Sequence, residues 1–197
     1  MPRLSLLVIG AALAAAAPAK TPPATGGNVV VSVSGAALQA AGKRLKGGSP
    51  IPAGVKLELG KGGRAVLRLG DAGVVELEGP ASFVLGKEPG FRLDAGRALS
   101  VLKRLAGPFS VTTAHVVASV RGTEFFVEAR GEGGTYLCLC SGALEVAARG
   151  GGFKTALTAA HHAAYLFAPK REGMTQATAP MEQHSDAQLE ALRKLLR

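Results

Sequence analysis

The chain has 197 residues with a formal net charge of +9, and it contains two cysteines and no tryptophan. This length is enough for one domain with a substantial core, which valine, leucine and alanine must fill because aromatic residues are few. The basic residues occur as isolated pairs rather than as a patch interleaved with aromatic side chains. That distribution argues against nucleic-acid binding and is typical of a solvated surface.

The first nineteen residues have the composition of an export signal. Arg3 supplies a positive start, residues 4–17 are apolar, and small residues precede a cleavage point between Ala19 and Lys20. A retained membrane anchor is the alternative, but the apolar run is shorter than the roughly 20 residues that a spanning helix needs. The sequence therefore predicts a signal peptide over 1–19. The mature chain is expected in the periplasm or otherwise exported, with no transmembrane anchor after cleavage.

The middle of the chain predicts an all-β domain. Residues 20–27 form a Pro- and Gly-rich spacer that we expect to be flexible, and from 28 to 168 short apolar runs alternate with turn residues. Apolar and polar positions alternate within the runs, which predicts strands with one buried and one wet face. Strands are expected over 28–34, 55–59, 65–69, 74–77, 82–85, 91–93, 97–102, 109–112, 116–120, 123–129, 135–140, 143–147, 153–157 and 162–167. Glycines such as Gly79 and Gly96 are assigned to turns between them. The pattern predicts a sandwich, a roll or a solenoid-like stack.

The C-terminal part predicts a linker followed by a helix. Residues 169–184 are polar and predict the linker, and residues 185–197 predict one amphipathic helix with a leucine stripe. Ser185 and Gln188 have the spacing of a capping box at the start of this helix. We expect the helix to dock on the β domain, and the alternative is an element for partner binding or self-association.

Several short motifs occur in a fixed order along the β region. They are GKRLKGG at 42–48, RAVLRLGDAGVVEL at 64–77, FRLDAGR at 91–97 and ASVRGTEF at 118–125. Together they resemble the FecR domain, an extracytoplasmic β module of regulators of iron-siderophore uptake, over roughly residues 28–148. An extra Gly and Ala displace the family's Asp-Gly-Ser turn, a departure that affects one hairpin.

The resemblance implies a many-stranded β module that binds a protein partner or ligand in the cell envelope. In the founding members a cytoplasmic segment binds a sigma factor, and a membrane helix connects that segment to the FecR domain; we expect this chain to lack both. Arg121, Gly122 and Thr123 match the best-marked positions of the family. We expect Gly122 to adopt a backbone conformation closed to other residues and Arg121 to tie a turn together, with ligand contact as the alternative.

The two cysteines lie on one predicted strand. Cys138 and Cys140 are two residues apart, so their side chains point to the same face. Their Cα atoms should be roughly 6.5–7 Å apart, at the limit of what a disulfide tolerates. An exported chain with two cysteines would nevertheless be expected to pair them.

Three histidines follow the cysteines, at His161, His162 and His184. Thiolates and imidazoles are the ligands that zinc and copper ions select, and the two groups converge if the strand that carries His161 or His162 pairs near the cysteine strand. His184 directly precedes the predicted helix, whose N-terminus favours a neutral imidazole. The spacing matches no standard metal motif. Three interpretations stay open: a zinc, copper or haem site, a disulfide, or cysteines packed as small apolar residues.

The sequence contains no sign of an enzyme. It has no Gly-x-Ser-x-Gly elbow, no His-Glu-x-x-His motif and no prominent pair of carboxylates. The leading prediction is an exported, non-enzymatic β module that binds a partner or ligand in signalling or sensing. The alternative is a metal- or haem-binding or thiol-redox protein of the periplasm.

Overall fold

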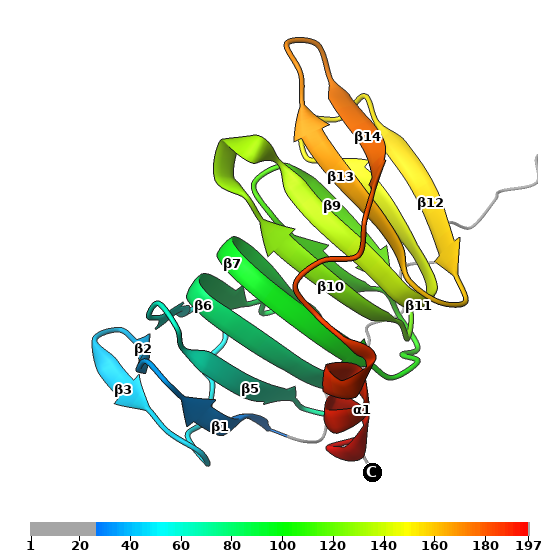
Figure 1. The fold of residues 1–197 in the computed structure, drawn as a ribbon. Coiled ribbons are helices and arrows are strands. Elements are labelled where there is room, and N and C mark those ends of the chain that lie inside the picture. Colours follow the sequence, from blue (N-terminus) through cyan, green and yellow to red (C-terminus); the bar gives the residue numbers. More distant parts are fainter. Residues whose placement is uncertain (1–26, 197) are drawn as a thin grey trace, which may run out of the picture.

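The computed structural model describes residues 27–196, so the predicted signal peptide and nearly all of the predicted spacer lie outside the described residues. Within this range fourteen strands join one sheet, and one α-helix follows them (Figure 1). The predicted class, all-β with one C-terminal helix, is confirmed. Residues 27–196 contain no helix with the length and apolar character needed to cross a membrane.

The sheet is built almost wholly from antiparallel neighbours. Its main path runs β14-β13-β11-β9-β8-β7-β6-β4-β2-β3, and the pairing of β7 with β8 is parallel. Strand β10 lies between β7 and β11, β5 joins β1 to β6, and β12 pairs with β11. The strands are β1 (Asn28–Ser34), β2 (Leu38–Ala40), β3 (Lys43–Leu45), β4 (Lys56–Leu59), β5 (Arg64–Leu69), β6 (Gly73–Leu85), β7 (Gly90–Leu102), β8 (Phe109–Thr112), β9 (Val116–Val120), β10 (Glu124–Ala129), β11 (Thr135–Ala148), β12 (Lys154–Ala159), β13 (Ala163–Pro169) and β14 (Met174–Ala179).

Three of these strands are longer than the sequence predicts. Strands β6, β7 and β11 each join two expected strands, and the assignment of Gly79 and Gly96 to turns is wrong because both lie inside strands. Gly96 has φ of +88°, and a Cβ atom there would meet the Pro80 carbonyl oxygen at 2.5 Å. The pairing register shifts beside it, between Glu78 and Ser82. A bulge thus bends the β6–β7 pair without ending it.

Strands β2, β3 and β14 are missing from the sequence prediction. The predicted linker over 169–184 is wrong at Met174–Ala179, where β14 pairs with β13. An edge strand has a paired neighbour on one side only and is largely exposed, so a polar composition is compatible with it. Strands β2 and β3 have three residues each, too few to show an alternating pattern.

The first part of strand β11, residues 135–140, is buried on both faces. Leu137 and Leu139 point into the main core, whereas Tyr136, Cys138 and Cys140 belong to a second apolar cluster on the opposite face. The expectation of one wet face is therefore wrong for this part of the sheet. Helix α1 and the segment before it cover the second face.

Helix α1 (Asp186–Lys194) docks on the sheet as expected. Leu189 and Leu192 are buried in the second apolar cluster with side chains of β6 and β7. Figure 1 shows the helix beside the ends of β5, β6 and β7. The predicted cap is confirmed, since the Ser185 side chain accepts a hydrogen bond from the Gln188 amide.

Candidate metal centre

The cysteine pair lies on the second face of β11. Cys138 and Cys140 are buried, with exposed fractions of 0% and 3%, and they alternate with Leu139, which faces the main core. The prediction that both thiols share one face is confirmed. Both are free cysteines, which argues against the disulfide interpretation.

His162 is brought to the cysteines by the pairing of β11 with β13. Cys138 lies opposite Ala164 in the register, and the His162 amide donates a hydrogen bond to the Cys140 carbonyl at 3.2 Å. The backbone of His162 has φ of +22°, an uncommon value for a residue with a side chain. The turn places Nδ1 of His162 3.5 Å from the Cys138 sulfur.

His184 lies in the segment that connects β14 to α1, residues 180–185, which we call the strap. The Tyr136 hydroxyl donates to the Pro180 carbonyl at 2.8 Å and accepts from the Glu182 amide at 2.9 Å, which fixes the strap over β11. The Phe126 ring stacks on His184 with the centroids 4.7 Å apart and the planes at 10°. His184 is therefore buried, and its Nε2 lies 3.4 Å from the Cys140 sulfur.

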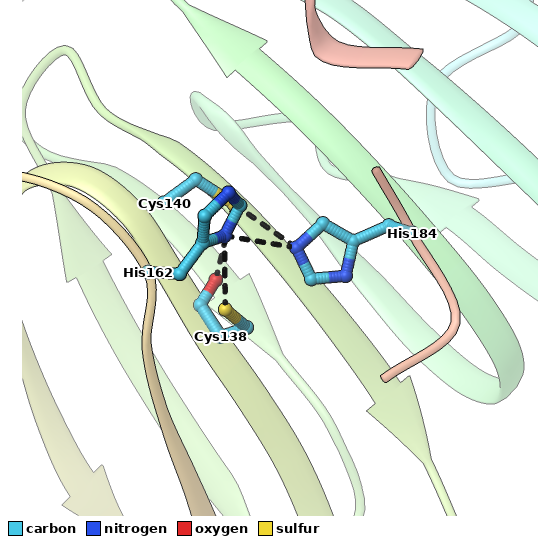
Figure 2. A group of neighbouring side chains, drawn as sticks. All are labelled: Cys138, Cys140, His162 and His184. Atoms are coloured by element: carbon cyan, nitrogen blue, oxygen red, sulfur yellow. Dashed lines mark hydrogen bonds between the residues drawn. The ribbon is translucent and has the colours of Figure 1, made fainter. Parts of the chain in front are cut away.

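Four potential ligand atoms converge at one point (Figure 2). The sulfurs of Cys138 and Cys140, Nδ1 of His162 and Nε2 of His184 all lie within 4.8 Å of one another. A tetrahedral zinc site, with Zn–S about 2.3 Å and Zn–N about 2.0 Å, places its nitrogens roughly 3.3 Å apart and each nitrogen roughly 3.5 Å from sulfur. The observed nitrogen–nitrogen distance is 3.3 Å and the nitrogen–sulfur distances are 3.5 and 3.4 Å. These three distances therefore match edges of a metal tetrahedron.

The outer nitrogen of each imidazole has a fixed acceptor. Nδ1 of His184 donates to the Glu182 carbonyl at 2.8 Å, because a carbonyl can only accept. Nε2 of His162 lies 2.9 Å from Oδ1 of Asp186, an ionised carboxylate that also accepts. When an imidazole held in this way is deprotonated at its second nitrogen, the free lone pair is on the nitrogen that faces the cluster. Metal-binding histidines are held in this way by carbonyls and carboxylates.

Hydrogen bonds shift the pKa values of His162 and Cys138 toward their charged forms. Burial acts to lower the pKa of His162, but its hydrogen bonds to Asp186 and Cys138 outweigh burial, and the pKa lies above its ordinary value. The hydrogen bond from Cys140 lowers the pKa of Cys138, and His184 and His162 lower it further. The same shared hydrogen bond raises the pKa of the Cys140 thiol. One thiolate, the form that binds metal, is therefore stabilised here.

His161 is not part of the four-atom cluster. It is exposed, and its ring meets the His162 ring edge-on with the centroids 4.4 Å apart. The structure groups it with His162 and Asp186 outside the cysteine pair. The sequence did not indicate a role for Asp186 at this site. Acidic residues are common in the first turn of a helix, so its presence there needed no other explanation.

The three positions of the family motif have different surroundings. Gly122 has φ of +70°, and a Cβ atom would lie 2.6 Å from the Arg104 Cα, so the predicted restriction to glycine is confirmed. Thr123 is buried, and its methyl group would meet a Cβ at Gly142. The expectation that Arg121 ties a turn together is wrong, because it is exposed and makes no hydrogen bond within residues 27–196. It lines a surface cavity between β9, β11 and β12 instead.

Comparison with known proteins gives the family. The family model described as FecR protein matches residues 55–153, half of the chain. The chain belongs to the FecR family. The matched part of this FecR protein includes Cys138 and Cys140, whereas His162 and His184 follow it. No curated protein matches the sequence.

Solved structures share the FecR fold. Two crystal structures of a candidate anti-sigma factor from Parabacteroides distasonis ATCC 8503, at 1.65 and 2.50 Å resolution, each align with a TM-score of 0.53 and 18% identity. The alignment covers 62% of this chain and 59% of that chain. At this identity the likeness shows the fold alone, and this FecR protein matches little more than half the length of that structure.

Proposed function

We propose that this FecR-family protein is a non-enzymatic module of the cell envelope that binds one zinc ion and acts in signalling or sensing through a partner. The zinc ligands are Cys138, Cys140, His162 and His184. The observation that carries the proposal is the convergence of four ligand atoms within 4.8 Å of one another, with one nitrogen–nitrogen and two nitrogen–sulfur distances within about 0.2 Å of the edges of a zinc tetrahedron.

The donor set favours zinc over the other cofactors considered. Two thiolates and two imidazoles in a tetrahedral arrangement suit zinc, and copper accepts the same ligand types. A haem needs a flat pocket around its iron, and four side chains that close around one point leave no room for the macrocycle. Zinc and copper are separated by direct measurement of the metal.

A structural role fits the coordination better than a catalytic role. The protein supplies all four ligands, and catalytic zinc sites keep one position for water or substrate. Asp186 and the Glu182 carbonyl orient the two imidazoles from outside. We therefore assign the ion to the stability of the folded module, in agreement with the absence of catalytic motifs from the sequence.

Family membership supports the signalling part of the proposal. FecR modules act by contact with other proteins, and the signal peptide predicted from the sequence supports a location in the periplasm or otherwise outside the cytoplasm. Free thiols in an exported protein tend to be oxidised, and coordination to zinc protects them. The partner is expected to be a protein or ligand of the envelope.

The test is a joint measurement of metal and thiols on the exported protein purified without chelator. Stoichiometric zinc, with both thiols unreactive until a chelator is added, is the expected result. Cys138→Ser and His184→Gln should abolish stoichiometric zinc, and the matched control His161→Gln should retain it. Two reactive thiols and no uptake of added zinc or copper would overturn the proposal.

A further inference from the structure

The metal centre lies at the start of the helix that covers the sheet. His184 directly precedes the N-cap residue Ser185, and Asp186, the first residue of α1, accepts a hydrogen bond from His162. One proposed ligand and one outer partner therefore lie within three residues at the N-terminal end of α1. Both contact residues that β11 and β13 hold in place.

The helix covers an apolar surface rather than a polar one. Leu189 and Leu192 lie against the outer face of β5, β6, β7 and β10, with exposed fractions of 1% and 2%. The side chains they cover include Val66, Val74, Leu99, Val101 and Phe126. This set is called the covered face below. It is continuous with the cysteine pair, which belongs to the same cluster.

The other attachments of α1 are weaker than a metal cross-link. Arg193 donates to both carboxylate oxygens of Glu124, Arg68 donates to the Leu195 carbonyl, and Gln188 donates to Glu76 at 3.3 Å. The Arg193 side chain is 41% exposed and that of Glu124 is 16% exposed, so solvent screens this pair in part. A helix of nine residues is also marginal when it is not held by tertiary contacts.

We propose that zinc acts as a latch that holds the strap and α1 on the sheet, so that loss of the metal releases them and uncovers the covered face. The proposal rests on the zinc site proposed above. The release begins after β14, because β14 stays paired with β13 and the strap follows it. Gln183 has φ of +65°, so the strap is held in a conformation that its contacts must maintain.

The closed arrangement is held less firmly when the metal is absent. The ligand nitrogen of His184 then has only hydrogen-bond contacts, to His162 at 3.3 Å and to the Cys140 sulfur at 3.4 Å. Such contacts are individually weak, and the strap is the segment that can move without breaking a strand pair. Zinc binding therefore favours closure of the helix, and closure favours zinc binding.

Hydrogen exchange of the full exported chain tests the latch. The protein is compared as purified with zinc, after removal of zinc by chelation, and after zinc is restored, with the metal content measured each time. The amides of α1 should lose protection at least tenfold without zinc and regain it when zinc returns. The amides of β6 and β7 should stay protected and report that the sheet remains folded.

Two variants distinguish the attachment of α1 from the binding of zinc. Leu189→Ala weakens the apolar contact but leaves every ligand, so it should bind zinc stoichiometrically while α1 exchanges faster than in the wild type. His161→Gln should behave as the wild type in both measurements. Equal protection of α1 in zinc-loaded and zinc-free protein would overturn the latch while the zinc site stands. Failure to bind zinc would remove the proposed function and the latch together.

Discussion

Nδ1 of His162 lies 3.3 Å from Nε2 of His184, although one residue precedes strand β13 and the other follows strand β14. Each ring has committed its other nitrogen to an acceptor, Asp186 in one case and the Glu182 carbonyl in the other. A proton on Nδ1 of His162 allows a hydrogen bond between the two rings, and a metal ion bound by both nitrogens can take its place. Their approach is stable when a cation accepts both lone pairs, and this relationship motivates the first two predictions.

Zinc should raise the stability of the folded protein. A ligand that binds only the folded state adds about 4 kcal/mol when its free concentration is about 1,000 times Kd. Thermal unfolding in buffered excess zinc should therefore occur at a clearly higher Tm than in the presence of a chelator. His161→Gln should show the same increase and Cys140→Ser should show none, and an equal Tm in both conditions for the wild type would contradict the prediction.

Asp186→Asn should weaken zinc binding without abolishing it. The change removes the charge that orients His162 and raises its basicity, and loss of such an outer partner typically costs about 10- to 100-fold in metal affinity. Competition with a chromophoric chelator measures this change. Glu190→Gln is the matched control, because Glu190 lies on the same helix but contacts Arg193 rather than a ligand. Equal affinities for the two variants would show that Asp186 does not support the site.

Glu76→Gln should stabilise the protein at neutral pH. Burial raises the pKa of Glu76 although Arg64 and Gln188 act against it. Because the pKa is higher in the folded state than in the unfolded state, the contribution of this group is full below the unfolded pKa and is lost as the pH rises through the folded pKa. Urea unfolding should show the variant to be more stable than the wild type at pH 7. The difference should shrink toward pH 4, and a constant difference would contradict the assignment.

Gly122→Ala should destabilise the fold by about 1–3 kcal/mol, because the added Cβ would need a left-handed backbone and would meet the Arg104 backbone. Gly150→Ala provides the control, since a Cβ there has nothing within 4 Å and its φ lies outside the left-handed range. Urea unfolding measures both variants in the same conditions. A variant at position 122 as stable as that at 150 would contradict the structural role of the glycine.

Local features of the site were predictable from the sequence, but the sequence did not show which histidines lie beside the two cysteines. The shared face of Cys138 and Cys140 follows from strand geometry, and the cap at Ser185 follows from residue spacing. The choice of His162 over His161 depends on the backbone turn at φ of +22°, which no pattern of residue types reveals. The partnership of His162 with Asp186 depends on where the helix docks, which is a tertiary property.

The same limit explains the errors in the fold. Alternation predicted the strand at 135–140 but not that both its faces are buried, because the covering segment is remote in the chain. Gly96 was placed in a turn since glycine is common there, whereas bulges use the same backbone freedom inside a strand. Strand β14 has a polar sequence that resembles a linker, and its pairing with β13 identifies it.

The boundary of the family match divides the proposed site between two parts of the chain. The match ends at residue 153, so the strand with the two thiols lies inside the matched part and both imidazoles lie in the segment after it. Without that covering segment, Cys138 and Cys140 would lie on an uncovered face of the sheet, where thiols are open to oxidation and exchange. The segment after the match therefore decides the chemistry of the two thiols in this chain.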